Sequence, residues 1–150
     1  MSDRTHVRIW IPIEIYEKHK DAIDEIMEYG FRDEGTTDDK KFMVFEDDEA
    51  DGGGNHVTSE LVEAKVPFAG QHDAGIEYEA CIFVFDGENK SEIPMDTHDG
   101  HYVRVKVYRG KVTIDEEALA DINRFRDTIR SFNDQFGNPH MACFGDFVND

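Results

Sequence analysis

The chain contains 150 residues, and its 34 acidic side chains outnumber the 16 basic ones, so the formal net charge is −18. A field of this strength repels nucleic acid, anionic membranes and acidic metabolites, whereas it attracts basic protein surfaces. Direct binding to DNA is therefore the function that the composition favours least, and a basic protein is the partner that it favours most.

The length and the apolar content are those of a single domain spanning residues 1–150. Apolar residues make up 39% of the chain and include 11 phenylalanines, and a chain of this size buries enough surface to fold without disulfide bonds. No window approaches the roughly 20 apolar residues of a membrane-spanning helix, and residues 1–6 lack the apolar core of a secretory signal. We therefore expect a cytoplasmic protein, in the host cytoplasm if the source is a phage or plasmid, in which Cys81 and Cys143 are reduced.

A strand followed by a helix is predicted at the beginning of the chain. Residues 5–13 alternate between apolar and polar side chains, which is the period of a half-buried strand. From residue 14 the apolar side chains recur every three or four positions as far as Met27, and this spacing predicts an amphipathic helix over about 14–29. Gly30 follows where a C-terminal cap is expected.

The next part of the chain is predicted as a short strand, a short helix and two loops. The strand covers residues 41–45. Residues 46–55 combine a run of acidic side chains with three consecutive glycines, and neither favours order, so we expect a flexible loop there. Residues 56–66 fit a helix or a strand, and we expect a helix. Residues 67–75 contain two glycines and are expected to form a loop that leads to the next strand.

Residues 80–85 are six consecutive apolar side chains, which is typical of a strand covered on both faces. We expect this strand to lie at the centre of the sheet. Turn sequences and alternating segments surround it, so an antiparallel meander is predicted over 76–108. A second amphipathic helix is predicted over about 114–136, with Thr113 and Glu116 forming a capping box at its start.

These elements together predict an α+β fold. Each of the two main helices, over 14–29 and 114–136, carries one apolar stripe that must pack against a sheet. The expected architecture is an antiparallel sheet of four or five strands with both main helices on one face. The tail, residues 141–148, contains Phe144 and Phe147 and is expected to cover the remaining apolar edge.

Acidic residues recur every three or four positions along the polar face of the first predicted helix. This spacing places one carboxylate on each turn, about 5.4 Å apart along the axis, and it resembles the regular charge of a nucleic-acid backbone, which recurs about every 3.4 Å per strand. The expected partner-binding residues are Glu14, Glu17, Asp21, Asp24, Glu25 and Glu28 on the helix and Glu46, Asp47, Asp48, Glu49 and Asp51 in the loop. An ordinary solvated helix face is the alternative explanation.

Two groups of histidine and aspartate residues offer an alternative, metal-binding interpretation. His98, Asp99 and His101 lie close together in the sequence, and His72 and Asp73 lie in another predicted loop that could converge on them. Imidazole and carboxylate ligands can hold zinc and activate water for hydrolysis. The same residues are also ordinary components of turns, so the leading interpretation includes no metal ion, no cofactor and no catalytic residue.

The sequence favours a binding protein over an enzyme. It contains no nucleophile elbow, phosphate-binding loop, dinucleotide fingerprint or Cys-x-x-Cys pair. We expect a small acidic inhibitor that occupies the nucleic-acid groove of a basic nucleic-acid-binding protein or nuclease, the mode of action of anti-CRISPR, anti-restriction and nuclease-immunity proteins. The alternatives are a small-ligand-binding protein that uses residues 67–75, a metal-dependent hydrolase, and a protein whose acidity serves only solubility or adaptation to salt.

Overall fold

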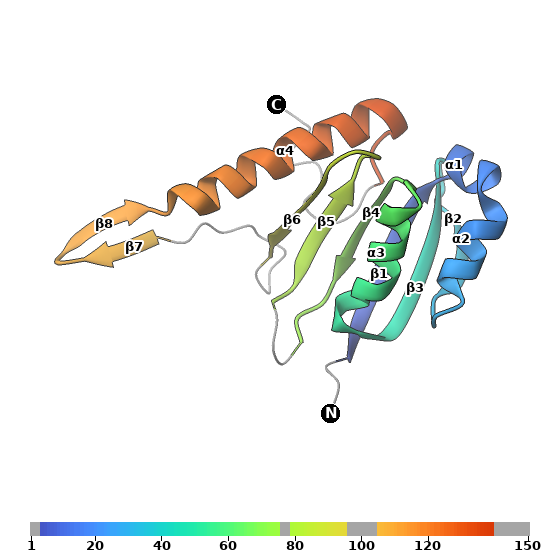
Figure 1. Ribbon diagram of the computed structural model, residues 1–150, viewed down its shortest axis with the longest axis horizontal. Coiled ribbons are helices and arrows are strands. Elements are labelled where there is room, and N and C mark those ends of the chain that lie inside the picture. Colours follow the sequence, from blue (N-terminus) through green and yellow to red (C-terminus); the bar gives the residue numbers. More distant parts are fainter. Residues whose placement is uncertain (1–3, 76–78, 96–104, 140–150) are drawn as a thin grey trace.

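The computed structural model describes residues 4–75, 79–95 and 105–139 (Figure 1). Its main element is a six-stranded antiparallel sheet in the order β2-β3-β1-β4-β5-β6. The strands of this sheet are β1 (Arg4–Pro12), β2 (Arg32–Thr36), β3 (Phe42–Asp51), β4 (Phe68–His72), β5 (Cys81–Phe85) and β6 (Lys90–Pro94). A separate two-stranded sheet consists of β7 (Val105–Tyr108) and β8 (Lys111–Ile114). The α-helices are α1 (Ile13–Lys18), α2 (Lys20–Met27), α3 (Asn55–Glu63) and α4 (Glu116–Phe136).

The predicted α+β class with an antiparallel sheet is confirmed, and the main sheet has six strands where four or five were expected. The apolar run at residues 80–85 forms β5, which is buried along its whole length. It is not central, however, because in the sheet formed by the described residues β5 is the second strand from one end, and β1 and β4 occupy the middle. The loop expected at residues 67–75 is wrong, since Phe68–His72 form β4 and pair with both β1 and β5.

The flexible loop expected at residues 46–55 is also wrong. Strand β3 continues through Asp51, which pairs with Arg4 of β1. Charge alone suggested disorder, but arginines on β1 and β2 supply the opposite charges that this strand needs. The three glycines Gly52–Gly54 form a tight turn with φ angles of 56°, 67° and 79°, a left-handed run that only glycine adopts readily. The helix expected within residues 56–66 is confirmed as α3.

The predicted meander over 76–108 is wrong beyond β6, because β7 pairs with β8 and not with the main sheet. This hairpin also moves the start of the last helix. Thr113 belongs to β8, and the N-cap of α4 is Asp115, whose side chain accepts a hydrogen bond from the Glu117 amide at 3.1 Å. The β-branched run from Val112 to Ile114 extends the hairpin, which explains why the helix begins after it.

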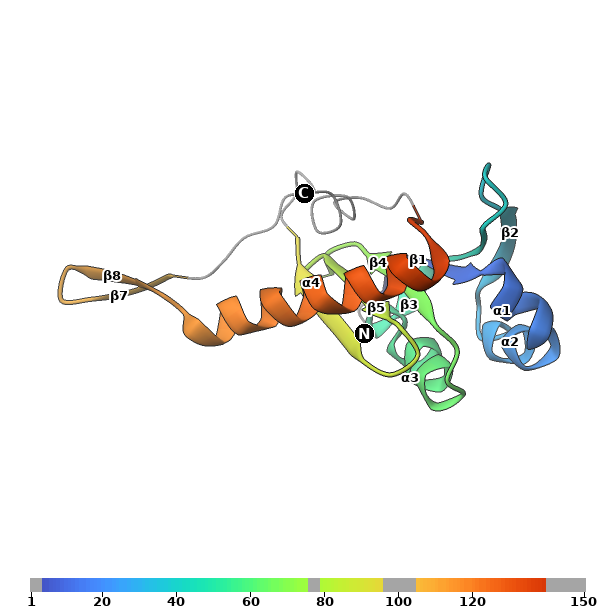
Figure 2. The same ribbon diagram turned by 90° about the horizontal axis from the view of Figure 1, so that it is seen from above.

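The helices cover opposite faces of the main sheet, so the expectation that both main helices share one face is wrong. On one face, buried residues of α2 and α3 pack with Val7, Ile9 and Ile11 of β1. On the other, α4 packs with Trp10 of β1 and Ile82 of β5. Since β1 and β5 carry apolar side chains on both faces, each face needs its own cover. In both views α1, α2 and α3 lie apart from α4 (Figures 1 and 2).

The helix predicted over 114–136 is confirmed as α4, and it ends at Gly137 as expected. The helix predicted over 14–29 is interrupted at His19, where φ is −123° and ψ is 30°. Within the described ranges, none of the helices combines the length and the apolar character that crossing a bilayer requires. The expected positions of Cys143 and of the tail at 141–148 lie outside the described residues.

Candidate functional site

The acidic residues predicted on one helix are divided between two short helices. Glu14 and Glu17 lie on α1 and Asp21 lies on α2, and all three are exposed. Because the helix axis is broken at His19, the carboxylates do not follow one straight row with a constant rise. The predicted spacing therefore holds only within each helix.

Asp24 has a structural role within this pair of helices. Its carboxylate accepts a hydrogen bond from the Tyr16 hydroxyl at 2.7 Å and from Lys20 Nζ at 3.0 Å. Burial opposes ionisation of Asp24, but these two hydrogen bonds and the Lys20 charge outweigh it and lower the pKa of the carboxyl. Asp24 thus joins α1 to α2 across the break, and it is half-buried, whereas the acidic residues Asp21 and Glu25 are exposed.

The Tyr16 contact gives a testable pH dependence. Burial, together with the hydrogen bond to Asp24, raises the pKa of Tyr16 to about 12. An unfolded tyrosine ionises near pH 10, so the folded state binds more protons in this interval and loses stability as the pH rises from about 10 towards 12. The variant Tyr16→Phe lacks the hydrogen bond to Asp24, so its free energy of unfolding near neutral pH should be about 1 kcal/mol lower than that of the wild type. Urea unfolding of both proteins should show that this difference in unfolding free energy decreases above about pH 10. A difference that stays constant with pH would contradict the raised pKa of Tyr16.

A hollow of about 640 Å³ lies between α2 and α3. Four carboxylates line it, and they come from Glu25 of α2, Glu28 at the C-cap of α2, and Glu60 and Glu63 of α3. Apolar contributions come from Ala22, Ile26 and Ala64, and the ring of Tyr29 lies at the end of α2 with 62% of the residue exposed. We call this hollow, defined by these eight residues, the acidic groove. A cationic side chain could contact several carboxylates there at once, and an aromatic ring beside them can add a cation–π contact.

A second hollow, of about 360 Å³, has Tyr29 as a lining residue in common with the acidic groove. It is lined by Asp47, Glu49 and Asp51 of β3, together with His56 at the start of α3. The Tyr29 and His56 rings meet edge to face with centroids 4.5 Å apart. The structure thus brings the end of the predicted acidic helix and part of the predicted acidic loop to two sides of one aromatic pair.

Gly30 explains how the two segments approach so closely. A β-carbon at this position would lie 2.7 Å from Asp47 Oδ2, and its φ of 106° is one that other residues rarely adopt. Arg4 lies in the second hollow and forms ion pairs with Glu49 at 3.8 Å and with Asp51 at 3.5 Å. These pairs are exposed and contribute little to stability, so a basic partner could replace them at small cost.

Two of the four carboxylates in the acidic groove were not predicted from the sequence. Glu60 and Glu63 were not selected, although their spacing of three residues on a predicted helix is the same signal that selected Glu25 and Glu28. No sequence pattern indicated Tyr29 or His56 as site residues, because they become neighbours only in the fold.

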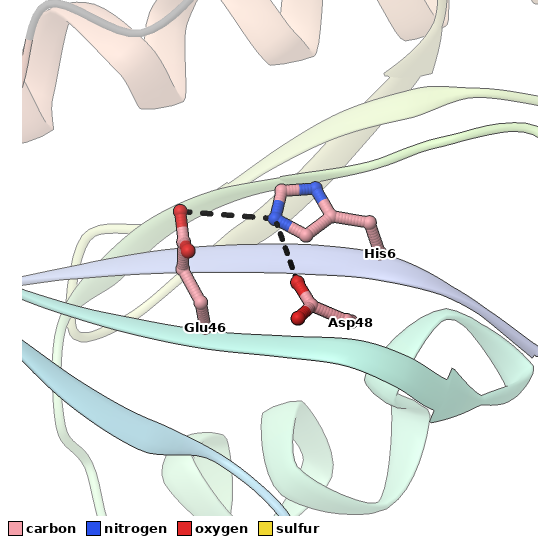
Figure 3. Close-up of side chains that lie close together, drawn as sticks. All are labelled: His6, Glu46 and Asp48. Carbon is pink, nitrogen blue, oxygen red and sulfur yellow. Dashed lines mark ion pairs between the residues drawn. The ribbon is translucent and has the colours of Figure 1, made fainter.

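Glu46 and Asp48 of β3 lie elsewhere, in a cluster with His6 of β1 (Figure 3). His6 Nε2 is 3.7 Å from Glu46 Oε1 and 3.9 Å from Asp48 Oδ1. Glu46 is buried and binds the guanidinium groups of Arg8 and Arg32. Hydrogen bonds from Arg32, at 2.9 and 3.2 Å, lower the pKa of Asp48 against a smaller opposing effect of burial.

This cluster has the ligand types of a metal site, but the negative charges of its carboxylates are already neutralised by arginines. Glu46 and Asp48 already share two arginine charges, and a divalent cation would have to bind beside those guanidinium groups. The arrangement is that of an ion-pair network that joins β1, β2 and β3. These two carboxylates are therefore engaged in the arginine network, whereas Glu49 in the second hollow forms an exposed ion pair with Arg4.

The residues of the metal-binding interpretation are only partly described. His98, Asp99 and His101 lie outside the described residues. Asp73 Oδ2 lies 3.9 Å from His6 Nδ1, whereas the His72 ring packs near Phe83 and Gly53. His72 also lines a hollow of about 490 Å³ near the start of α4, together with Cys81. Burial, with the nearby Glu92 carboxylate, raises the pKa of the Cys81 thiol, so this cysteine is not activated as a nucleophile.

Comparison of the chain with protein-family models, with curated proteins and with solved structures finds no match.

Proposed function

We propose that the protein is a small acidic inhibitor that binds a basic nucleic-acid-binding protein or nuclease and occupies its nucleic-acid groove. The observation that carries this proposal is the convergence of two acidic segments, distant in sequence, on the exposed Tyr29. The mode of action would be that of anti-CRISPR, anti-restriction or nuclease-immunity proteins, and the site of action the cytoplasm.

Charge supports this class of partner. The chain carries a formal net charge of −18, and a surface of this sign accelerates association with a basic protein while it repels nucleic acid. In the acidic groove, carboxylates line both walls, so an arginine or lysine side chain entering it would meet acceptors on two sides. A protein that normally binds phosphates presents such cations in its own groove.

Under this proposal the predicted partner-binding residues have three different roles. Glu25 and Glu28 line the acidic groove and Asp47, Glu49 and Asp51 the adjoining hollow, so these five contact the partner directly. Glu14, Glu17 and Asp21 are exposed and contribute to long-range attraction. Asp24, Glu46 and Asp48 are already bound to side chains of this chain and contribute structure.

A matched pair of variants tests the groove. Glu28→Lys with Glu63→Lys reverses one carboxylate on each wall, and Asp127→Lys with Asp134→Lys makes the same change of net charge on exposed positions of α4. Tagged wild-type protein is used to capture partners from the native host at low salt, and captured proteins are eluted by increasing salt. We expect a basic nucleic-acid-binding protein whose affinity falls roughly tenfold or more for the groove variant and far less for the α4 variant.

The captured protein must then be tested for inhibition. Addition of the wild-type chain should displace nucleic acid from it, or block cleavage if it is a nuclease, and the groove variant should fail to do so. Equal loss of affinity in both variants would show that the partner responds to net charge and does not bind the acidic groove. Capture of a partner without displacement of nucleic acid would overturn the inhibitory role.

A further inference from the structure

The β7–β8 hairpin projects from the body of the protein at the end of α4 opposite to Gly137 (Figures 1 and 2). It pairs with no strand of the main sheet. The turn at its tip is formed by Arg109 and Gly110, both with positive φ, as in the two-residue turns that suit a tight hairpin. A two-stranded hairpin is marginally stable in water unless its apolar side chains are covered.

One face of this hairpin is entirely aliphatic and exposed. Cross-strand pairing places Val105 opposite Ile114 and Val107 opposite Val112, so all four side chains lie on the same face. Their exposed fractions are 55%, 58%, 68% and 66%, in that order. The opposite face is polar, and its residues are Lys106, Tyr108, Lys111 and Thr113. An exposed aliphatic face of this kind, on a sheet that has two strands within the described residues, is typical of an interaction surface.

Charges of opposite sign lie at the two ends of the hairpin. The tip is basic, with Arg109 beside Lys111, and the guanidinium of Arg109 lies over the Tyr108 ring at 5.2 Å. The base is acidic, because Asp115, Glu116 and Glu117 follow one another at the start of α4 and Lys106, which pairs with Asp115 at 3.9 Å, supplies one opposite charge. A second hairpin of the same sequence, packed face to face and antiparallel, would bring each basic tip to the other's acidic base.

We propose that the β7–β8 hairpin is a dimerisation arm whose aliphatic face packs against the same face of a second copy of this chain. A two-fold axis makes such a contact self-complementary, so that Val107 and Val112 of one copy meet Val105 and Ile114 of the other. The two sheets would then pack about 10 Å apart and bury all eight aliphatic side chains. Since the arms project, the strongly acidic bodies remain apart, which limits their mutual repulsion.

Two substitutions on neighbouring residues of β8 test the aliphatic face. Val112→Lys places a charge on that face, and Thr113→Lys places the same charge on the polar face. Sedimentation equilibrium of the full chain should give a mass that rises towards that of a dimer as concentration increases. We expect Val112→Lys to weaken dimerisation at least roughly tenfold and Thr113→Lys to leave it nearly unchanged. Circular dichroism and thermal unfolding check that both variants are folded, as is expected for exposed positions.

A charge exchange tests the antiparallel arrangement. Arg109→Glu should weaken the dimer, and combining it with Glu116→Arg and Glu117→Arg should restore it, because tip and base again carry opposite charges. A monomeric wild-type chain at every concentration up to about 1 mM would overturn the proposal. Equal effects of Val112→Lys and Thr113→Lys would overturn it as well, and failure of the charge exchange to restore the dimer would overturn the antiparallel packing.

Discussion

Replacing Phe132 with alanine should lower the free energy of unfolding by about 4 kcal/mol, within the usual range for a fully buried aromatic side chain. Phe132 is 0% exposed and stacks on Phe42 of β3 with ring centroids 6.0 Å apart. It also contacts Phe136 at a centroid distance of 5.2 Å. The substitution would leave a cavity between α4 and the sheet, beside Phe125 and Ile129, which are also fully buried there.

Leu119→Ala on the same helix is the matched control for Phe132→Ala. Leu119 is 43% exposed, so its truncation removes little buried surface and should change stability by less than about 1 kcal/mol. Guanidinium unfolding followed by circular dichroism measures both variants. Similar losses for the two would mean that α4 is not attached to the sheet through Phe132.

Replacing Gly70 with alanine should cost about 3 kcal/mol, although the change adds only one methyl group. A β-carbon at Gly70 would lie 2.3 Å from Phe83 Cε2 and 3.0 Å from the Arg8 carbonyl oxygen. Phe83 is the cross-strand partner of Gly70, and its ring lies across the position that a side chain would occupy. The ring would have to leave its place in the core shared with Phe68.

A double-mutant cycle tests the origin of this cost. In a Phe83→Leu background the same Gly70→Ala change meets a smaller and more adaptable neighbour, so it should cost clearly less than in the wild type. Urea unfolding of the four proteins gives the coupling energy. Equal costs of Gly70→Ala in both backgrounds would show that the backbone, and not the Phe83 ring, resists the substitution.

The elements that could be predicted from sequence are those whose periodicity is local. Alternation identified β1, six consecutive apolar residues identified β5, and spacing of three or four residues identified α4. Strand β2 was missed because Arg32–Thr36 is polar and mostly exposed, so it carries no alternation. Strand β4 was missed because Gly70 is read as a loop residue, when it in fact makes room for the ring of Phe83.

The charged part of β3 shows why composition alone misjudged order. The acidic residues at 46–51 suggest repulsion when they are considered by themselves, but their counter-charges are Arg4 and Arg8 on β1 and Arg32 on β2. Those partners are distant in sequence, so only the sheet reveals them. The same limit applies to the acidic groove, since the sequence marks Glu25 and Glu28 but cannot place α3 beside them.

Gly52–Gly54 has a practical consequence for engineering. From its composition alone, this segment looks like a flexible spacer that would tolerate insertion of a tag, a cleavage site or a fluorescent probe. In the fold it is a tight turn, where a β-carbon at Gly53 would lie 2.9 Å from the His72 ring and one at Gly54 would lie 3.3 Å from Val7. An insertion there would redirect the chain as it leaves β3 and would pull α3 away from α2, so labels for binding studies should be attached elsewhere.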